Sequence, residues 1–260
     1  MGIDHVIDLD CAAKRALGPE GIGELVKCRS RAETVLAIAR QNGDARPAAE
    51  ISFQVAVQRP SGVETTDVSV QALFDRAAAL DGHRGGCAQC PANGGQAGGF
   101  GCYRSIAYPI EVETEQWLWS RLPTDSESTA RQFLSRGVVD FGWDGAQAAQ
   151  MRAQGGTFFE STSPISGRWP DGFSFDTNQL FHIMFQVGHL GSTHCLMLAC
   201  FLGMLPHDLD PNILRDPNRR GQLLAMAAVP PQRDQVEQMA DFLRSIVMSA
   251  RLEAELLIDG

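Results

Sequence analysis

Residues Asp81 to Cys102 read DGHRGGCAQCPANGGQAGGFGC, with eight glycines in 22 positions. A loop this rich in glycine loses much conformational entropy when it becomes ordered, and it buries little apolar surface. Some other interaction must therefore hold it in place. The loop carries three cysteines, Cys87, Cys90 and Cys102, and a metal ion bound to their thiolates would supply that interaction.

The spacing of these residues is typical of a metal site. Cys87 and Cys90 are separated by two residues, so both thiolates can face one ion, and Cys102 returns from the far end of the loop. His83 precedes Cys87 by four residues, and zinc accepts histidine nitrogen alongside cysteine sulfur. The sequence thus predicts a structural zinc site within loop 83–102, with four ligands: Cys87, Cys90, Cys102 and His83.

Several alternatives stay open on sequence grounds. Cys11 and Cys28 are rival candidates for the fourth ligand, and either would tie the N-terminal region to the loop. Cys90 is followed by proline, as in ferredoxin-type loops, so an iron–sulfur cluster is the alternative cofactor. Cys87 and Cys90 are also a candidate redox dithiol, in which case the protein would be a thiol redox sensor.

The composition is that of a folded globular protein, since 44% of the 260 residues are hydrophobic and 20% are charged. A formal net charge of -9 argues against extended nucleic-acid binding, which requires a positive surface. The N-terminus shows no secretory signal pattern, so a cytoplasmic location is expected. In that reducing compartment, closely spaced cysteines indicate metal ligands or redox groups rather than disulfides.

One long uncharged stretch, Thr177 to His207, has to be weighed as a membrane span. Polar side chains interrupt it, and its uninterrupted apolar run, Cys195 to Leu205, covers about half of the roughly 20 residues that a span requires. A buried core helix is therefore predicted, with no membrane association. The stretch also holds His182, His189 and His194, which helical geometry separates, so we expect buried, hydrogen-bonded histidines rather than a second metal site.

The periodicity of the chain predicts the elements that flank the cysteine loop. Apolar residues at helical spacing indicate helices, and alternating apolar residues indicate strands. The expected elements are a helix from the capping box Ser30–Glu33 to Asn42, strands at 51–57 and 63–68 joined by a turn, a helix capped by Ser69, and a third strand at 105–110.

Downstream of residue 112 the pattern is mainly helical. We expect helices at 113–122, from the capping box Thr124–Glu127 toward Val139, and over 236–257. The irregular segment 155–176 is a candidate lid, because long ordered loops are often functional. The carboxylates near the start of the first of these helices are interpreted as N-terminal helix charges: Glu111, Glu113 and Glu115.

These elements predict an α+β protein. A small antiparallel sheet with the Cys-rich metal-binding loop, in a region spanning 1–122, is expected to pack against a mainly α-helical C-terminal region spanning 123–260. The two regions are expected to form one compact unit.

The leading functional hypothesis is a zinc-stabilised interaction or regulatory protein without catalytic activity, because no catalytic constellation accompanies the cysteines. It would act through a protein partner, and the regular apolar stripe of helix 236–257 also suits a homodimer. The rival hypothesis is an enzyme that uses an iron–sulfur cluster or an open metal site, with 155–176 closing over a substrate.

Overall fold

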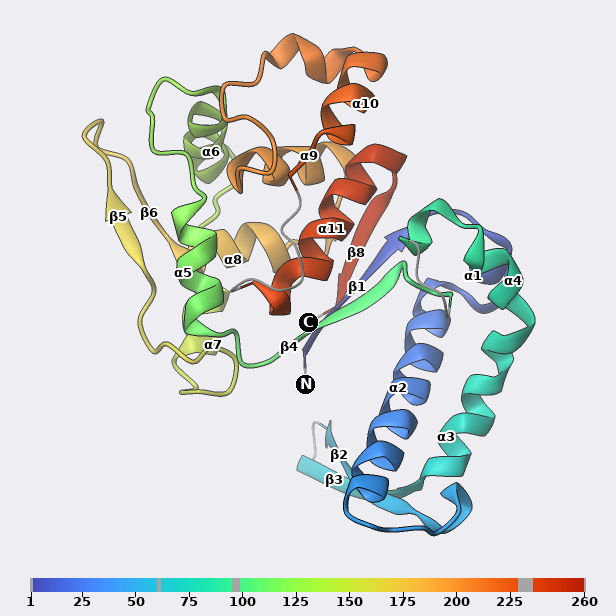
Figure 1. Ribbon diagram of the computed structural model, residues 1–260. Helices are drawn as coiled ribbons and strands as arrows, with labels where there is room; N and C mark the ends of the chain where they lie inside the picture. The colour runs from blue at the N-terminus through green and yellow to red at the C-terminus, as the bar shows by residue number, and fades with distance from the viewer. Residues whose placement is uncertain (1, 60–61, 95–98, 229–235, 260) are drawn as a thin grey trace. The chain divides into compact units, whose positions relative to one another are not determined.

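The chain forms two compact units in the computed structural model, which describes residues 2–59, 62–94, 99–228 and 236–259 (Figure 1). Unit 1 comprises Met1–Leu9 and Arg104–Gly260, and unit 2 comprises Asp10–Tyr103. Unit 2 is thus an insertion in the sequence of unit 1. This division differs from the predicted boundary at residue 122, because the first strand of the chain pairs with its last.

Unit 1 contains a four-stranded sheet in the order β4-β1-β8-β7. Strand β8 lies between β1 and β7 and runs antiparallel to both. Its Leu257 pairs with Val6 of β1 on one side and with His189 of β7 on the other. The side chains of Leu256 and Ile258 are buried, as the alternation of a strand requires. The bounds are Gly2–Asp8 for β1, Tyr103–Ala107 for β4, His189–Leu190 for β7 and Glu255–Asp259 for β8.

Helices make up most of the rest of unit 1. Helices α9 (Ser192–Phe201) and α11 (Glu237–Leu252) pack against each other and against the sheet, with α6 (Thr129–Asp140) on α9 (Figure 1). Helix α7 (Ala146–Arg152) packs on α8 (Thr177–Phe185). The remaining elements are α5 (Val112–Ser120), the hairpin β5 (Ser166–Arg168) and β6 (Ser174–Asp176), η4 (Pro211–Arg215) and α10 (Pro217–Ala225).

Unit 2 is built on α2 (Pro19–Gln41), which packs lengthwise against α3 (Val70–Ala77). One apolar cluster, centred on Ala32, Ile51 and Val70, joins these helices to the hairpin region. The other elements are α1 (Ala12–Leu17), η1 (Ala48–Glu50), β2 (Ser52–Arg59), β3 (Gly62–Ser69), η2 (Ala78–His83), α4 (Arg84–Ala88) and η3 (Pro91–Asn93).

Local signals in unit 2 predicted its elements well, but not its sheets. The hairpin β2–β3 and the cap of α3 are confirmed, since the Ser69 side chain accepts a hydrogen bond from the Ala72 amide. Helix α2 ends as predicted but begins at Pro19, so Ser30 lies in its interior and the predicted capping box is wrong. The predicted three-stranded sheet is also wrong, because β4 pairs with β1 instead of with the hairpin.

Three predictions for unit 1 need correction. Helix α6 is capped by Ser128 instead of Thr124. Helix α11 ends at Leu252, because Glu253 takes a left-handed conformation (φ 54°) and the next residues form β8. The uncharged stretch 177–207 is two helices separated by β7, and no helix in the described part of the chain is long and apolar enough to cross a membrane.

The apolar stripe of α11 is buried within unit 1. Met239, Leu243 and Ile246 are fully covered by the rest of the chain. The stripe therefore packs inside the protein, so it no longer supports the predicted homodimer through this helix.

Candidate functional site

Four cysteines of unit 2 occupy the ends of short elements. Cys11 is the N-cap residue of α1, Cys87 lies in α4, Cys90 is the N-cap residue of η3, and Cys102 directly precedes β4. Helix α1 packs against α4. Cys87 belongs to a buried apolar cluster against which Cys11 also packs. The fold of unit 2 thus gathers thiols from the beginning and the end of its sequence.

Asn93 links the two halves of the cysteine loop. Its backbone N–H donates to the Cys90 carbonyl at 2.9 Å, and its side-chain Oδ1 accepts from the Gly101 amide at 2.6 Å. Both Asn93 and the neighbouring Cys102 are buried. This residue therefore holds the Cys90 side of the loop beside the Cys102 side.

The backbone at Gly99 and Phe100 brings the loop against Cys87. Both residues have positive φ values, 76° at Gly99 and 58° at Phe100. A Cβ atom at position 99 would lie 3.2 Å from the Cys87 Cβ, so glycine serves both the left-handed conformation and the close approach. The Phe100 ring is buried in the same apolar cluster as Cys87.

Burial and neighbouring groups raise the pKa of two of these thiols. The pKa of Cys102 is raised to about 11, mainly by burial, with Cys90, Cys87 and Cys11 adding to the shift and the charge of Lys14 opposing it. Burial also raises the pKa of Cys87, with Cys11 and Cys90 adding to the shift, while a hydrogen bond with the Phe100 backbone and the Lys14 charge oppose it. Without a cation, Cys87 and Cys102 are therefore neutral thiols at physiological pH.

The structure places the predicted ligands unequally. Cys11, Cys87 and Cys90 are near enough to Cys102 to raise its pKa, whereas His83 at the end of η2 and Cys28 within α2 are not among the groups that act on Cys87 or Cys102. In the described part of the chain, no three His, Cys, Asp or Glu side chains are positioned to hold one metal ion. The thiols converge without having adopted the geometry of ligands.

The histidines of the uncharged stretch lie on three elements of unit 1. His182 on α8 accepts a hydrogen bond from the Gly145 amide at 3.3 Å, and His189 on β7 is exposed. His194 on α9 stacks on Trp143 with a centroid distance of 5.9 Å, and burial lowers its pKa to about 4. They do not form one group. The adjacent Cys195 is fully buried and has a pKa raised to about 12 by burial, so it is a core thiol.

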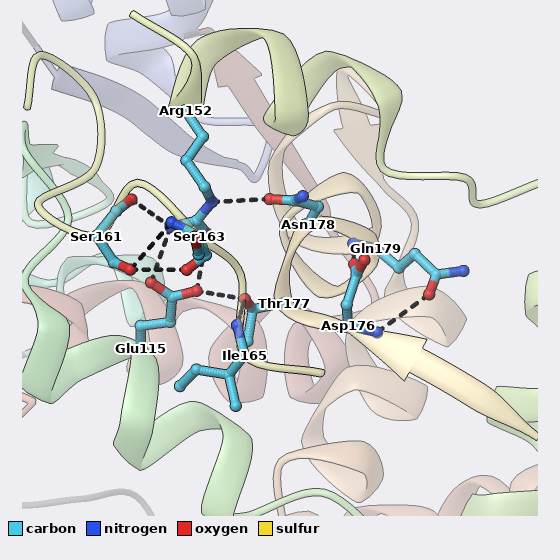
Figure 2. A network of polar contacts seen from close by, with 9 residues as sticks. All are labelled: Glu115, Arg152, Ser161, Ser163, Ile165, Asp176, Thr177, Asn178 and Gln179. Atoms are coloured by element: carbon cyan, nitrogen blue, oxygen red, sulfur yellow. Dashed lines mark hydrogen bonds and ion pairs between the residues drawn. The ribbon is translucent and has the colours of Figure 1, made fainter. Parts of the chain in front are cut away.

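A second cluster of polar side chains lies inside unit 1, around Arg152 of α7 (Figure 2). Its guanidinium donates to both carboxylate oxygens of Glu115, at 2.7 and 3.1 Å, and to Asn178 Oδ1 at 3.0 Å. Thr177 donates its hydroxyl to the same carboxylate. Glu115 and Arg152 are 1% and 3% exposed, so this bidentate pair is closed to solvent.

This network is structural. Arg152 also donates to the Ser161 carbonyl at 2.8 Å, and the Ile165 amide donates to the Thr177 hydroxyl, so the segment 155–176 is fastened at both points (Figure 2). The carboxylate is fully engaged by its partners and has no face toward solvent. Glu115 lies in the first turn of α5, as the sequence predicts, but its carboxylate also pairs with Arg152, and no local sequence signal reveals that partner 37 residues away.

The comparisons with known proteins add no family. No protein-family model, curated protein sequence or solved structure matches the chain.

Proposed function

We propose that unit 2 binds a metal through four cysteine thiolates, Cys11, Cys87, Cys90 and Cys102, with zinc as the leading occupant. The observation that carries the proposal is that three thiols from separate segments of unit 2, Cys11, Cys87 and Cys90, lie near enough to Cys102 to raise its pKa, and that Cys11 packs against the cluster of Cys87. In this proposal Cys11 replaces His83 as the fourth ligand.

The energetics of the loop support a bound cation. Its glycines give little apolar burial to offset the entropy of ordering. The pKa values of Cys87 and Cys102 are raised mainly by burial, with a smaller contribution from neighbouring thiols. A divalent ion would displace the thiol protons and convert mutual repulsion into attraction, so that binding and ordering are one event. On this basis the chain acts as a metal-stabilised interaction or regulatory protein.

The test is metal analysis of the purified protein combined with cobalt substitution. We expect one zinc per chain, and a cobalt form with the strong absorption of thiolate coordination. Replacing any one of Cys11, Cys87, Cys90 or Cys102 by Ser is expected to lower metal affinity sharply. Cys28→Ser and His83→Ala are the matched controls in the same unit and should retain it. Full zinc binding by all four cysteine variants would refute the proposal.

An iron–sulfur cluster is the second candidate, supported by two observations. Cys90 is followed by proline, and the Phe100 backbone forms a hydrogen bond with the Cys87 sulfur, a contact of the kind that tunes cluster potentials. Anaerobically purified protein would then be brown, with broad absorption near about 400 nm and equal amounts of iron and sulfide. A colourless zinc protein would eliminate this candidate.

The thiol redox sensor is less well supported. A reactive cysteine needs a lowered pKa, because the thiolate is the nucleophile, whereas burial and neighbouring thiols raise the pKa of Cys87. A reversible disulfide between Cys87 and Cys90 in metal-loaded protein would favour the sensor over the structural site.

A further inference from the structure

Unit 1 contains an open pocket that lies apart from the thiols of unit 2. Its walls come from β1, residues 108–110, α7, Phe159 and the end of α8. The pocket encloses about 410 Å³ of empty space, its open mouth included, which is in the size range of small-molecule sites. Four aromatic side chains line it: Tyr108, Phe159, Phe181 and Phe185.

Hydrogen bonds and ring contacts fix the walls of this pocket. The Ile110 amide donates to the Phe158 carbonyl at 2.8 Å, and the Glu160 amide donates to the Ile110 carbonyl at 3.0 Å. The Phe159 and Phe181 rings contact each other with centroids 5.0 Å apart. Because the site is formed before a ligand arrives, little ordering opposes binding.

The lining favours an uncharged ligand. The described residues around the pocket include no acidic or basic side chain, and burial raises the pKa of Tyr108 to about 12, so its hydroxyl stays neutral. An ion would lose its hydration here without gaining a counter-charge. Aromatic walls instead suit a planar apolar group, which can stack on the rings or meet them edge-on.

The free space has the size of about one ring. The centres of water molecules can occupy about 40 Å³ of the pocket, which is room for roughly three waters. That amount of liquid takes up roughly 90 Å³, close to the volume of one six-membered aromatic ring. Water against apolar walls finds few hydrogen-bond partners, so its displacement favours binding.

Gln186 at the end of α8 adds a polar requirement. Its Nε2 donates to Met151 Sδ at 3.8 Å, and its Oε1 is buried with no hydrogen-bond partner in the described part of the chain. A buried acceptor without a partner is unfavourable. A donor on the ligand that reaches this oxygen would remove that cost.

From these observations we propose that the pocket binds an uncharged molecule with a single aromatic ring, which lies against the aromatic walls and donates a hydrogen bond to Gln186 Oε1. Phenol is the simplest molecule of this class. Fluorobenzene has nearly the same shape and lacks the donor, so the two molecules separate the contribution of the ring from that of the hydrogen bond.

The test titrates the full-length protein with phenol and with fluorobenzene, followed by NMR of isotope-labelled methionine methyl groups. The ring should shift the methyl signal of Met151, which lines the pocket, and leave that of the exposed Met226 unchanged. Met151→Leu assigns the signal. The two titrations give a Kd for each molecule and hence the preference for phenol over fluorobenzene.

Three variants locate the ring and its donor. Gln147→Trp puts a bulky side chain at the exposed rim and should raise both Kd values at least about tenfold. Gln150→Trp makes the same change at an exposed position of α7 outside the lining and should leave both within about twofold. Gln186→Leu removes the acceptor at similar volume and should lower the preference for phenol about fivefold.

The outcomes are distinct. A shift of the Met151 signal that is lost in Gln147→Trp, with a reduced phenol preference in Gln186→Leu, would support the proposal. No Met151 shift, or undiminished binding by Gln147→Trp, would overturn it. An unchanged preference in Gln186→Leu would also overturn it, because the ring would then bind without the donor. None of these outcomes depends on zinc, so the metal site and this pocket succeed or fail separately.

Discussion

His5 on β1 should make unit 1 sensitive to acid. Its side chain is 1% exposed, neither ring nitrogen has a hydrogen-bond partner, and the ring meets Phe242 edge-on at 5.2 Å. Burial lowers its pKa from 6.5 to about 3, with the charge of Arg104 adding to the shift and the backbone of Asp241 opposing it. The folded protein therefore keeps this imidazole neutral where the unfolded chain protonates it.

The sign and size of the effect follow from proton linkage. Between pH 6.5 and about 3 the unfolded state binds one proton more than the folded state, so stability falls as pH falls. Each pH unit in that window removes about 1.4 kcal/mol of unfolding free energy, or roughly 2 to 3 kcal/mol between about pH 6.5 and 4.5. Above pH 6.5 both states are neutral at this residue and the effect vanishes.

The variant His5→Leu removes the titration and both unpaired nitrogens while keeping a similar volume. We expect it to be as stable as the natural protein at neutral pH, or more stable by about 1 kcal/mol. Urea unfolding at several pH values, followed by tryptophan fluorescence, measures this, because all four tryptophans lie in unit 1. His189→Gln, at an exposed position, is the control. Equal acid sensitivity in the natural protein and His5→Leu would refute the reasoning.

Three further predictions concern packing, the buried ion pair and the thiols. Glu115→Gln leaves its buried guanidinium partner without a counter-charge and should cost about 3 to 5 kcal/mol in urea unfolding. Gly137→Ala should cost about 1 to 3 kcal/mol and shift tryptophan emission, because its Cβ would lie 2.2 Å from the Trp143 ring, whereas Gly221→Ala, which meets no atom within 4 Å, should be neutral or stabilising. Zinc affinity should rise with pH below about 11, since metal must displace the proton of Cys102, and a competition titration at two pH values showing no change would argue against thiolate ligation.

The features predicted correctly from the sequence are those encoded within a few residues. The alternation in 51–57 defines a strand, and Ser69 caps the following helix through a hydrogen bond that spans three positions. In each case the interacting groups are neighbours along the chain, so the pattern alone contains the geometry.

The features that were missed depend on partners far apart in sequence. Strand β1 was not expected, because its partner β8 lies at the opposite end of the chain. The sequence of β8 also continues the apolar helical pattern of α11. Glu115 and Arg152 pair across 37 positions with no motif to link them. Cys11 was an alternative to the predicted fourth ligand His83, because only the packing of α1 against α4 brings it to the loop.

The position of Cys11 changes what the proposed metal would do for the fold. A site confined to loop 83–102 would stabilise that loop alone. Cys11 is the second residue of unit 2 and Cys102 is its second-last, so a metal that binds both closes the whole insertion near its two ends. A covalent cross-link over a loop of that length stabilises by about 4 to 5 kcal/mol through loss of unfolded-state entropy, and a metal held by both thiolates acts in the same direction.

Because unit 2 contains no tryptophan, chelation should remove helical circular dichroism while tryptophan emission from unit 1 stays unchanged. A simultaneous loss of both signals would show instead that the metal stabilises the two units as one.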